Sequence, residues 1–185
     1  MNFELTPEQQ AFRDSVRGFA EKHLRAGALA RAHDPAHPWD VSRLMAQQGL
    51  MGITMPEEDG GQGGTLMDAI LAIEAVALVC PKSADVVQAG NFGPVRVLAE
   101  YGTRDQKARY LQPILTGEEV WCQLFSEPGA GSDLASLGTR AVKDGDEWVI
   151  NGQKVWTSIA QFSQWGMLVA RTDVEKPKHE GLTYF

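Results

Sequence analysis

The chain has 185 residues, of which 43% are hydrophobic and 22% charged, as in an ordinary globular protein that buries a core. Its formal net charge of −7, without any cluster of Lys and Arg, repels a phosphate backbone, so we expect no nucleic-acid partner. The longest apolar stretch, residues 69–80, includes Glu74 and falls short of the roughly 20 residues that cross a bilayer, so we expect no membrane span.

The N-terminal part, residues 1–117, is predicted to be helical. Its first residues lack the basic and apolar regions of a signal peptide, so we expect a cytoplasmic protein. The segment 6–9 (Thr-Pro-Glu-Gln) combines an N-cap hydroxyl, a proline at the first helical position and a glutamine three residues after the cap, which predicts a helix start. Behind it, apolar residues at helical spacing predict one buried stripe: Phe12, Val16, Phe19 and Leu24.

Further helices are predicted from the same capping and periodicity signals. Gly49 is placed as a C-terminal stop for the second of them. The helix after the Thr65–Asp68 cap is apolar nearly all round, which favours a place inside a helix bundle. Residues 56–64 are predicted to form a loop; its glycine-rich stretch, residues 60–64, lacks the Gly-Lys-Ser/Thr of a phosphate loop and is interpreted as a flexible connection. The predicted helices are residues 40–48, residues 70–79, a stretch that ends at Tyr101, and one from Thr103 to about Leu115.

After Gly117 the apolar period changes from 3.6 to 2, which indicates strands. Asn151-Gly152 is the strongest short-range hairpin signal, so we expect it to join two strands; Asp144-Gly145 predicts another turn. The last predicted strand breaks off at the end of the sequence, which indicates a truncated chain. The predicted strands are residues 121–125, 139–143, 147–150, 153–157, 166–171 and 181–185.

These elements predict an α+β fold in two domains. Residues 1–117 form an N-terminal all-α helical domain, and residues 118–185 form an antiparallel β-barrel-like domain that is incomplete at its C-terminal end. The two cysteines, Cys80 and Cys122, lie far apart and fit neither a disulfide scaffold nor a zinc site, so we predict no metal site.

The segment 123–133 (QLFSEPGAGSD) carries the richest pattern. Its glycines allow close approach of a ligand to the backbone, and consecutive N–H groups in such a turn can cradle an anion. Ser126 and Ser132 add hydroxyls for a phosphate or the edge of a heterocycle. A plain surface loop explains the same residues about equally well. The segment is not a dinucleotide-binding fingerprint, because Leu134 occupies the position of the third glycine and no βαβ unit follows.

A second segment, residues 151–158 (NGQKVWTS), delivers an indole and two hydroxyls in succession. Trp156 can stack on a planar ring, while Thr157 and Ser158 offer hydrogen bonds to its polar edge. Taken alone, Trp156 is more simply explained as a core aromatic residue. Together, however, the two segments supply an anion cradle and an aromatic platform with donors, the two parts that a flavin nucleotide needs.

At this point the sequence resembles the acyl-CoA dehydrogenase family. The resemblance lies in Trp121–Asp133 (WCQLFSEPGAGSD), Trp148–Ser158 (WVINGQKVWTS) and Val169–Thr172 (VART), and the helical opening fits in order and spacing. The family has an N-terminal helical domain, a middle β-domain and a C-terminal four-helix domain. The resemblance therefore implies that this chain holds the first domain, most of the second and none of the third.

The resemblance also implies a site for FAD. Ser126 would lie beside the isoalloxazine, Gly131 and Ser132 near the diphosphate, and Ser158 near the reactive edge of the ring. Ser132 would also touch the CoA arm of the substrate. The cofactor-binding residues implied in this way are Gln123, Phe125, Ser126, Gly131, Ser132, Trp156, Thr157 and Ser158.

The implied activity is α,β-dehydrogenation of acyl-CoA thioesters in lipid catabolism, with electron-transfer flavoprotein as electron acceptor and a homo-oligomeric full-length form. The family's catalytic base is a glutamate of the C-terminal domain, so no catalytic residue is assigned here, and Glu127 is interpreted as structural. Residues 91–95 are proposed as part of the acyl-binding wall. Two alternatives remain open: a non-catalytic fragment or partner subunit, and an acyl-CoA oxidase or flavin monooxygenase of the same fold.

Overall fold

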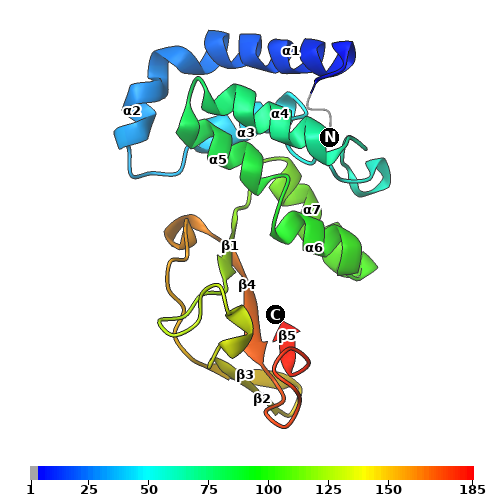
Figure 1. Cartoon of the computed structure of the whole chain (residues 1–185), viewed down its shortest axis with the longest axis vertical. Coiled ribbons are helices and arrows are strands. Elements are labelled where there is room, and N and C mark those ends of the chain that lie inside the picture. Colours follow the sequence, from blue (N-terminus) through cyan, green and yellow to red (C-terminus); the bar gives the residue numbers. More distant parts are fainter. Residues whose placement is uncertain (1–3) are drawn as a thin grey trace. The chain divides into compact units, whose positions relative to one another are not determined.

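The computed structural model describes residues 4–185 and divides into two compact units, one ending at Val120 and the other comprising Trp121–Phe185 (Figure 1). The α-helices belong to the first unit and the strands to the second. The predicted α+β class, with a helical part followed by a β part, is therefore confirmed.

The first unit begins with helix α1, Pro7–Leu24, which starts as the sequence predicts. The hydroxyl of Thr6 accepts a hydrogen bond from the backbone N–H of Gln9 at 3.2 Å, and the side chain of Gln9 accepts one from the N–H of Thr6 at 3.0 Å. This capping box satisfies donors that the first turn of a helix leaves free. The later helices are α2 (Ala28–His33), α3 (Trp39–Gln47), α4 (Leu66–Ala77), α5 (Pro81–Ala89), α6 (Pro94–Tyr101) and α7 (Arg104–Leu115).

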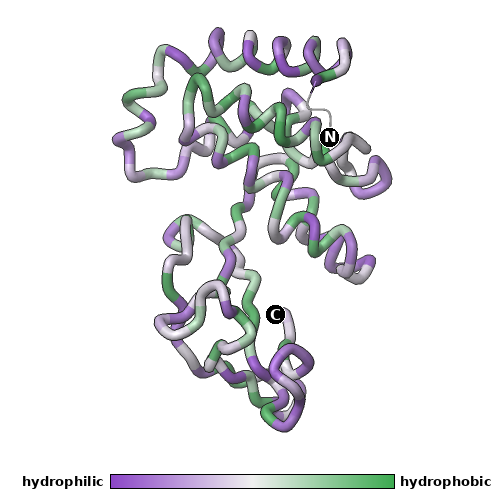
Figure 2. The backbone as a smooth tube through the Cα atoms, in the orientation of Figure 1, coloured by the Kyte–Doolittle hydropathy of each residue, from purple (hydrophilic) through white to green (hydrophobic). Residues whose placement is uncertain are grey.

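Helix α4 lies between α1 and α5 and contributes most to the helical core (Figure 1). Along α1 hydrophilic and hydrophobic stretches alternate, whereas α4 is predominantly hydrophobic (Figure 2). One side of α4 is nevertheless open, because Met67 and Ile70 are 44% and 47% exposed. The expected burial of this helix inside a bundle therefore holds for only part of its circumference.

The segment between α3 and α4 is tightly folded, and its interpretation as a flexible connection is wrong. The N–H groups of Gly61, Gly63 and Gly64 donate to the carbonyls of residues 56, 55 and 53 at 2.7–2.9 Å. A Cβ atom on Gly61 would lie 2.3 Å from the carbonyl oxygen of Met55. The glycines are thus needed because the backbone packs against itself.

In the second unit the strands form a five-stranded sheet of order β1-β4-β2-β3, with β5 paired to β4. β4 pairs in parallel with β1 and β2, whereas the β2–β3 and β4–β5 pairs are antiparallel. The sheet is therefore mixed, and the predicted antiparallel pairing is correct only for β2–β3 and β4–β5. Its path is open among the described residues. The strands are β1 (Trp121–Leu124), β2 (Arg140–Asp144), β3 (Glu147–Asn151), β4 (Trp165–Arg171) and β5 (Leu182–Tyr184).

The predicted hairpin at Asn151-Gly152 is wrong. β2 and β3 are joined instead at Gly145, whose φ of +59° is the left-handed value that hairpin turns favour, as the Asp144-Gly145 signal predicts. Gly152 has no such φ, and residues 152–157 form no strand. The reason is packing against a residue that is not adjacent in sequence: a Cβ on Gly152 would lie 2.1 Å from the hydroxyl oxygen of Thr139. This glycine serves a close approach of two segments rather than a turn.

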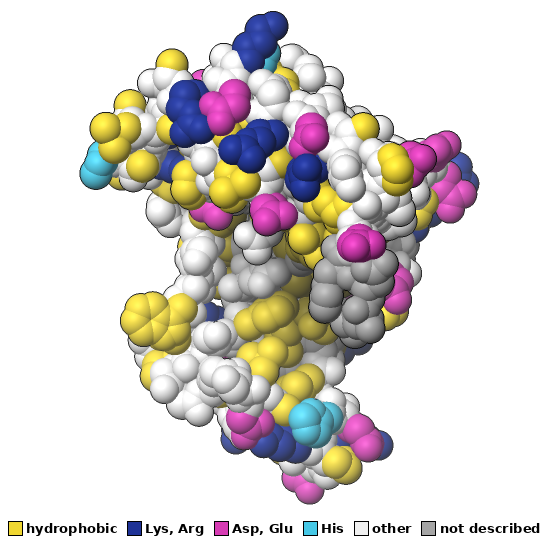
Figure 3. All heavy atoms as spheres, turned by 45° about the horizontal axis from the view of Figure 1, so that its top comes forward, with side chains coloured by type: hydrophobic (Ala, Val, Ile, Leu, Met, Phe, Trp, Pro, Cys, Tyr) yellow, Lys and Arg dark blue, Asp and Glu magenta, His cyan; other side chains and the backbone are white. Residues whose placement is uncertain are grey.

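The described surface of the helical unit carries Lys/Arg and Asp/Glu side chains interspersed on the face shown in Figure 3. Within residues 4–185, no helix combines the length and the apolar character needed to cross a membrane.

Candidate functional site

A tight turn follows β1. The backbone N–H of Glu127 donates to the carbonyl of Ala130 at 2.8 Å, and the N–H of Ala130 donates back at 3.1 Å. Pro128 lies inside the turn, where its fixed φ favours the bend. Ala130 is buried in one hydrophobic cluster with Val169 of β4. The first of the two sequence motifs is thereby fixed to the sheet.

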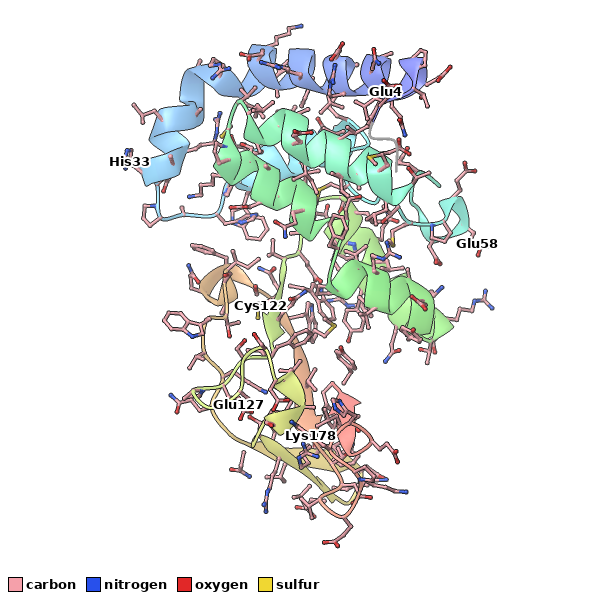
Figure 4. All side chains as sticks on the ribbon, viewed as in Figure 1. Glu4, His33, Glu58, Cys122, Glu127 and Lys178 are labelled. Atoms are coloured by element: carbon pink, nitrogen blue, oxygen red, sulfur yellow. The ribbon has the colours of Figure 1, made fainter. Side chains whose placement is uncertain are left out.

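The side chain of Glu127 ties this turn to two other segments; its position is labelled in Figure 4. One carboxylate oxygen accepts from the backbone N–H of Gly138 at 2.6 Å. The other accepts from the N–H of Thr139 at 2.9 Å and from the ammonium of Lys154 at 3.0 Å. The Glu127 and Lys154 side chains are only 11% and 8% exposed. The carboxylate is engaged by protein donors, which agrees with its interpretation as a structural residue.

These contacts change the acidity of Glu127. Burial by itself would raise the pKa of this carboxyl, but hydrogen bonds from Thr139, Gly138 and Lys154 favour the ionised form and lower the pKa to about 2. The carboxylate is therefore ionised throughout the physiological range. That charge state suits an anchor and does not suit a base that must take up a proton near neutral pH.

The lowered pKa of Glu127 predicts acid sensitivity of the sheet unit. Because the folded pKa lies below the ordinary value of 4.5, the stabilisation is present above about pH 4.5 and is lost as pH falls towards 2. We expect a loss on the order of 2 kcal/mol, allowing for partial solvent screening. Urea unfolding at pH 5 and pH 3, followed by tryptophan fluorescence, measures it. Glu127→Gln is expected to be less stable at pH 5 and to lose less on acidification; an equal loss in both proteins would contradict the prediction.

Lys154 and its neighbour Val155 bring the second motif against the first. The Lys154 ammonium also donates to the carbonyl of Phe125 at 2.9 Å. The backbone N–H of Val155 donates to the carbonyl of Ser126 at 2.9 Å. Two segments that are nearly thirty residues apart in sequence thus lie side by side within one unit. A ligand site shared by the two motifs needs this convergence.

Hydrogen-bond donors in and next to the two motifs remain unused within the described residues. Among the described residues, no partner is found for the backbone N–H groups of residues 131–135. Gly131, Ser132 and Asp133 are exposed, so their N–H groups are open to water or to a ligand. A Cβ added to Gly129 or Gly131 would meet nothing within 4 Å, so a ligand has room to approach. Four hydroxyls in the two motifs likewise make no hydrogen bond within residues 4–185: those of Ser126, Ser132, Thr157 and Ser158.

Trp156 lies on the surface and in a strained backbone conformation. It is 90% exposed, so its explanation as a core aromatic residue is wrong. Its φ is +58°, and that of Ile159 is +61°. Such values are uncommon for residues other than glycine, above all for a β-branched side chain, and strain of this kind often marks functional segments. The carbonyl of Ile159 accepts a hydrogen bond from the hydroxyl of Ser163 at 3.0 Å.

Two further residues predicted to bind the cofactor, Gln123 and Phe125, lie at the start of the first motif. Gln123 is exposed on β1, in register with Met167 of β4. The ring of Phe125 packs into the cluster that contains Ala130, and it lies edge-on to Tyr184 at a centroid distance of 5.9 Å. Its backbone carbonyl, and not its ring, is therefore the part of Phe125 that borders the junction.

Sequence reasoning missed Lys154. The available signal was a pair of opposite charges, Glu127 in the first motif and Lys154 as the one charged residue of the second. Charged side chains are usually paired with an opposite charge when they are buried. The pairing itself could not be deduced without knowing that the two motifs are adjacent.

The chain belongs to the acyl-CoA dehydrogenase family. Residues 6–118 match the family model of the acyl-CoA dehydrogenase N-terminal domain, and residues 122–185 match that of the middle domain. The resemblance noted in the two motifs is thereby confirmed over both units.

Three similar proteins illustrate the relationship. Acyl-CoA dehydrogenase IpdE1 of Mycobacterium tuberculosis is 39% identical over 95% of this chain and 48% of its own length. A chain of the ChsE4–ChsE5 complex of the same species is 31% identical, with a TM-score of 0.86 over 100% of this chain and 48% of that one. Butyryl-CoA dehydrogenase of Megasphaera elsdenii is 28% identical, with a TM-score of 0.85 over 100% of this chain and 49% of that one. The chain thus spans about half the length of the relatives it matches.

Proposed function

We propose that this chain supplies the FAD-binding front part of an acyl-CoA dehydrogenase. The observation that carries the proposal is the junction of the two motifs, in which Lys154 and Val155 bond to the carbonyls of Phe125 and Ser126. Both motifs also carry donors that make no hydrogen bond within the described residues. An anion cradle and an aromatic platform with hydroxyls together suit a flavin dinucleotide.

The proposed division of roles follows the chemistry of the donors. The free N–H groups of residues 131–135, with the hydroxyl of Ser132, suit the diphosphate and the CoA arm of the substrate. The hydroxyls of Ser126, Thr157 and Ser158 suit the polar edge of the ring, and the indole of Trp156 suits its face. Gln123 would border the ring segment from β1, and Phe125 would contribute its backbone.

The proposed reaction is the α,β-dehydrogenation of an acyl-CoA thioester. Bound FAD would accept the hydride that leaves the β-carbon. The residues of this chain would orient the cofactor and the thioester. We assign none of them as the base that removes the α-proton, because Glu127 is engaged by Thr139, Gly138 and Lys154. The base is proposed to be a glutamate in a further helical domain of the whole protein.

The proposed partners and location follow from the family. Electrons would leave through an electron-transfer flavoprotein, and the full-length protein would be a homo-oligomer in the cytoplasm. A similar chain occurs in the ChsE4–ChsE5 complex, which supports assembly of the full-length protein with other subunits.

The acyl group can be identified with a panel of acyl-CoA thioesters. Each thioester is tested anaerobically for bleaching of the flavin absorbance of the full-length protein.

FAD titration tests the proposal. The 185-residue chain is expected to bind FAD weakly or not at all, since it covers 48% of a typical relative, whereas a full-length form should bind it stoichiometrically. In that form, Ser132→Ala should weaken FAD or substrate binding about tenfold or more, the effect of losing one buried hydrogen bond. Ser136→Ala is the control, because its hydroxyl bonds to Asp133 within the loop. Unchanged flavin affinity and KM for Ser132→Ala would remove Ser132 from the site.

A second candidate is a chain that is not catalytic by itself and acts as a fragment or partner subunit. A full-length form that binds no flavin would support this candidate against the first. An acyl-CoA oxidase or flavin monooxygenase of the same fold is distinguished by the reaction of the reduced flavin with oxygen.

A further inference from the structure

Two successive backbone carbonyls of the first motif are held by two successive residues of the second. The carbonyl of Phe125 accepts from the Lys154 ammonium at 2.9 Å, and the carbonyl of Ser126 accepts from the Val155 N–H at 2.9 Å. The next residue, Glu127, accepts from the same ammonium at 3.0 Å. Lys154 therefore controls the peptide group between Phe125 and Ser126 directly.

The orientation of that peptide group determines where Ser126 directs its N–H. In a trans peptide the N–H points opposite to the carbonyl of the preceding residue. Since the Phe125 carbonyl is turned towards Lys154, the Ser126 N–H is turned away from it. Within residues 4–185 this N–H has no hydrogen-bond partner, and neither has the Ser126 hydroxyl. Both donors are thus left available, and the N–H lies on the side of the peptide away from the ion pair.

A buried lysine is an expensive way to hold a loop, because its ammonium must be desolvated. Here the side chain is 8% exposed, and its charge is balanced by Glu127, which itself is fixed by the N–H groups of Gly138 and Thr139. An apolar side chain could fill the same space without that cost. What an apolar side chain could not do is orient the Phe125 carbonyl and withdraw electron density from it.

We propose that Lys154, held in place by Glu127, is a positioning residue that orients and polarises the Phe125–Ser126 peptide, so that Ser126 presents a strengthened N–H donor to the ring of the bound flavin. Hydrogen bonds in a chain strengthen one another, so a cation on the carbonyl makes the N–H of the same peptide a better donor. This inference rests on the proposed flavin site. The inference also separates two parts of that site: Lys154 acts on the Phe125–Ser126 peptide, which is proposed to face the flavin ring, and not on residues 131–135, which are proposed to bind the diphosphate.

The first test requires no ligand. NMR of the isotopically labelled 185-residue chain measures the carbonyl carbon of Phe125 and the amide proton of Ser126. Lys154→Met should shift both resonances, Lys154→Arg should restore them towards the wild-type values, and the control Lys143→Met, on an exposed lysine of β2, should leave them unchanged. If Lys154→Met fails to fold, Lys154→Gln takes its place. Unchanged Phe125 and Ser126 resonances in the Met or Gln variant would overturn the proposal.

The second test separates positioning from general damage. The test uses a form of the protein shown to bind FAD. In that form, Lys154→Met should lower the affinity for FAD about tenfold and change the affinity for ADP, which lacks the flavin ring, by no more than about twofold. Lys154→Arg should retain most of the FAD affinity. Equal losses for FAD and ADP would show a merely structural role and overturn the proposal, as would an unchanged FAD affinity. If no form of the protein binds FAD, the proposed function fails, and the NMR comparison alone decides the role of Lys154 in orienting the peptide.

Discussion

Gly152→Ala is expected to lower the free energy of unfolding of the sheet unit by about 3 kcal/mol, the upper range for forcing an extra methyl group into a packed site. The new Cβ would lie 2.1 Å from the hydroxyl oxygen of Thr139 and 2.7 Å from its Cα. Rotation of a side chain cannot relieve a contact with a backbone atom. Thr139 cannot retreat either, because its N–H donates to Glu127 at 2.9 Å and its carbonyl accepts from Arg171 at 2.8 Å.

The same substitution should disturb the proposed ligand site, because Thr139 is one of the anchors of Glu127. Urea unfolding followed by tryptophan fluorescence reports mainly on the sheet unit, where four of the five tryptophans lie. Gly129→Ala is the matched control for stability: its new Cβ meets nothing within 4 Å and its φ is not in the left-handed region, so we expect a change below about 0.5 kcal/mol. Equal midpoints for Gly152→Ala and the wild type would contradict this account of the close approach.

Features encoded by a few adjacent residues could be predicted from the sequence. The helix starts at Thr6, Thr65 and Thr103 all form capping boxes in the structure. Each box needs only a hydroxyl and a side-chain acceptor three residues later, so the pattern determines the geometry. The turn at Gly145 belongs to the same class, since the glycine and the alternating residues on both sides lie within one hairpin.

Features that depend on distant residues could not be predicted in this way. The local pattern at Asn151-Gly152 predicts a hairpin turn, because it contains no information about Thr139, against which Gly152 packs. The ion pair of Glu127 and Lys154 joins positions in separate motifs, and only the fold reveals that they meet. Trp156 was ambiguous for a related reason: aromatic residues are common in cores, and its 90% exposure follows from the path of the whole segment.

The candidate site likewise contains features that could be predicted from the sequence and features that could not. The sequence predicted which residues carry donors, because glycines, hydroxyls and an indole at this spacing suit a flavin. It could not predict which of those donors remain free, since that depends on every other hydrogen bond in the unit. The structure adds that the N–H groups of residues 131–135 have no partner in the described chain, which narrows the proposed phosphate cradle to that run.

Residues 91–95, which are predicted to be part of the acyl-binding wall, provide a further example. In the structure the side chain of Asn91 is fully buried and makes three hydrogen bonds inside the helical unit. It accepts from the N–H of Ile53 at 2.6 Å and donates to the carbonyls of Leu50 and Val87, both at 2.8 Å. Asn91 thus connects the end of α5 to the segment after α3. The role of this segment as a wall stays a prediction, but the Asn91 side chain is already used for structure.

Asn91→Ala should therefore lower the free energy of unfolding of the helical unit by about 3–4 kcal/mol. The substitution leaves one N–H and two carbonyls buried without their partner, each costing about 1 kcal/mol or more, and it adds a small cavity. Circular dichroism at the helical band reports on this unit, since the α-helices belong to it. Gln88→Ala, which removes an exposed amide side chain from the same helix α5, is the matched control and should change stability by less than about 0.5 kcal/mol. Similar unfolding midpoints for the two variants would show that water replaces the lost Asn91 contacts, and that the segment after α3 does not depend on them.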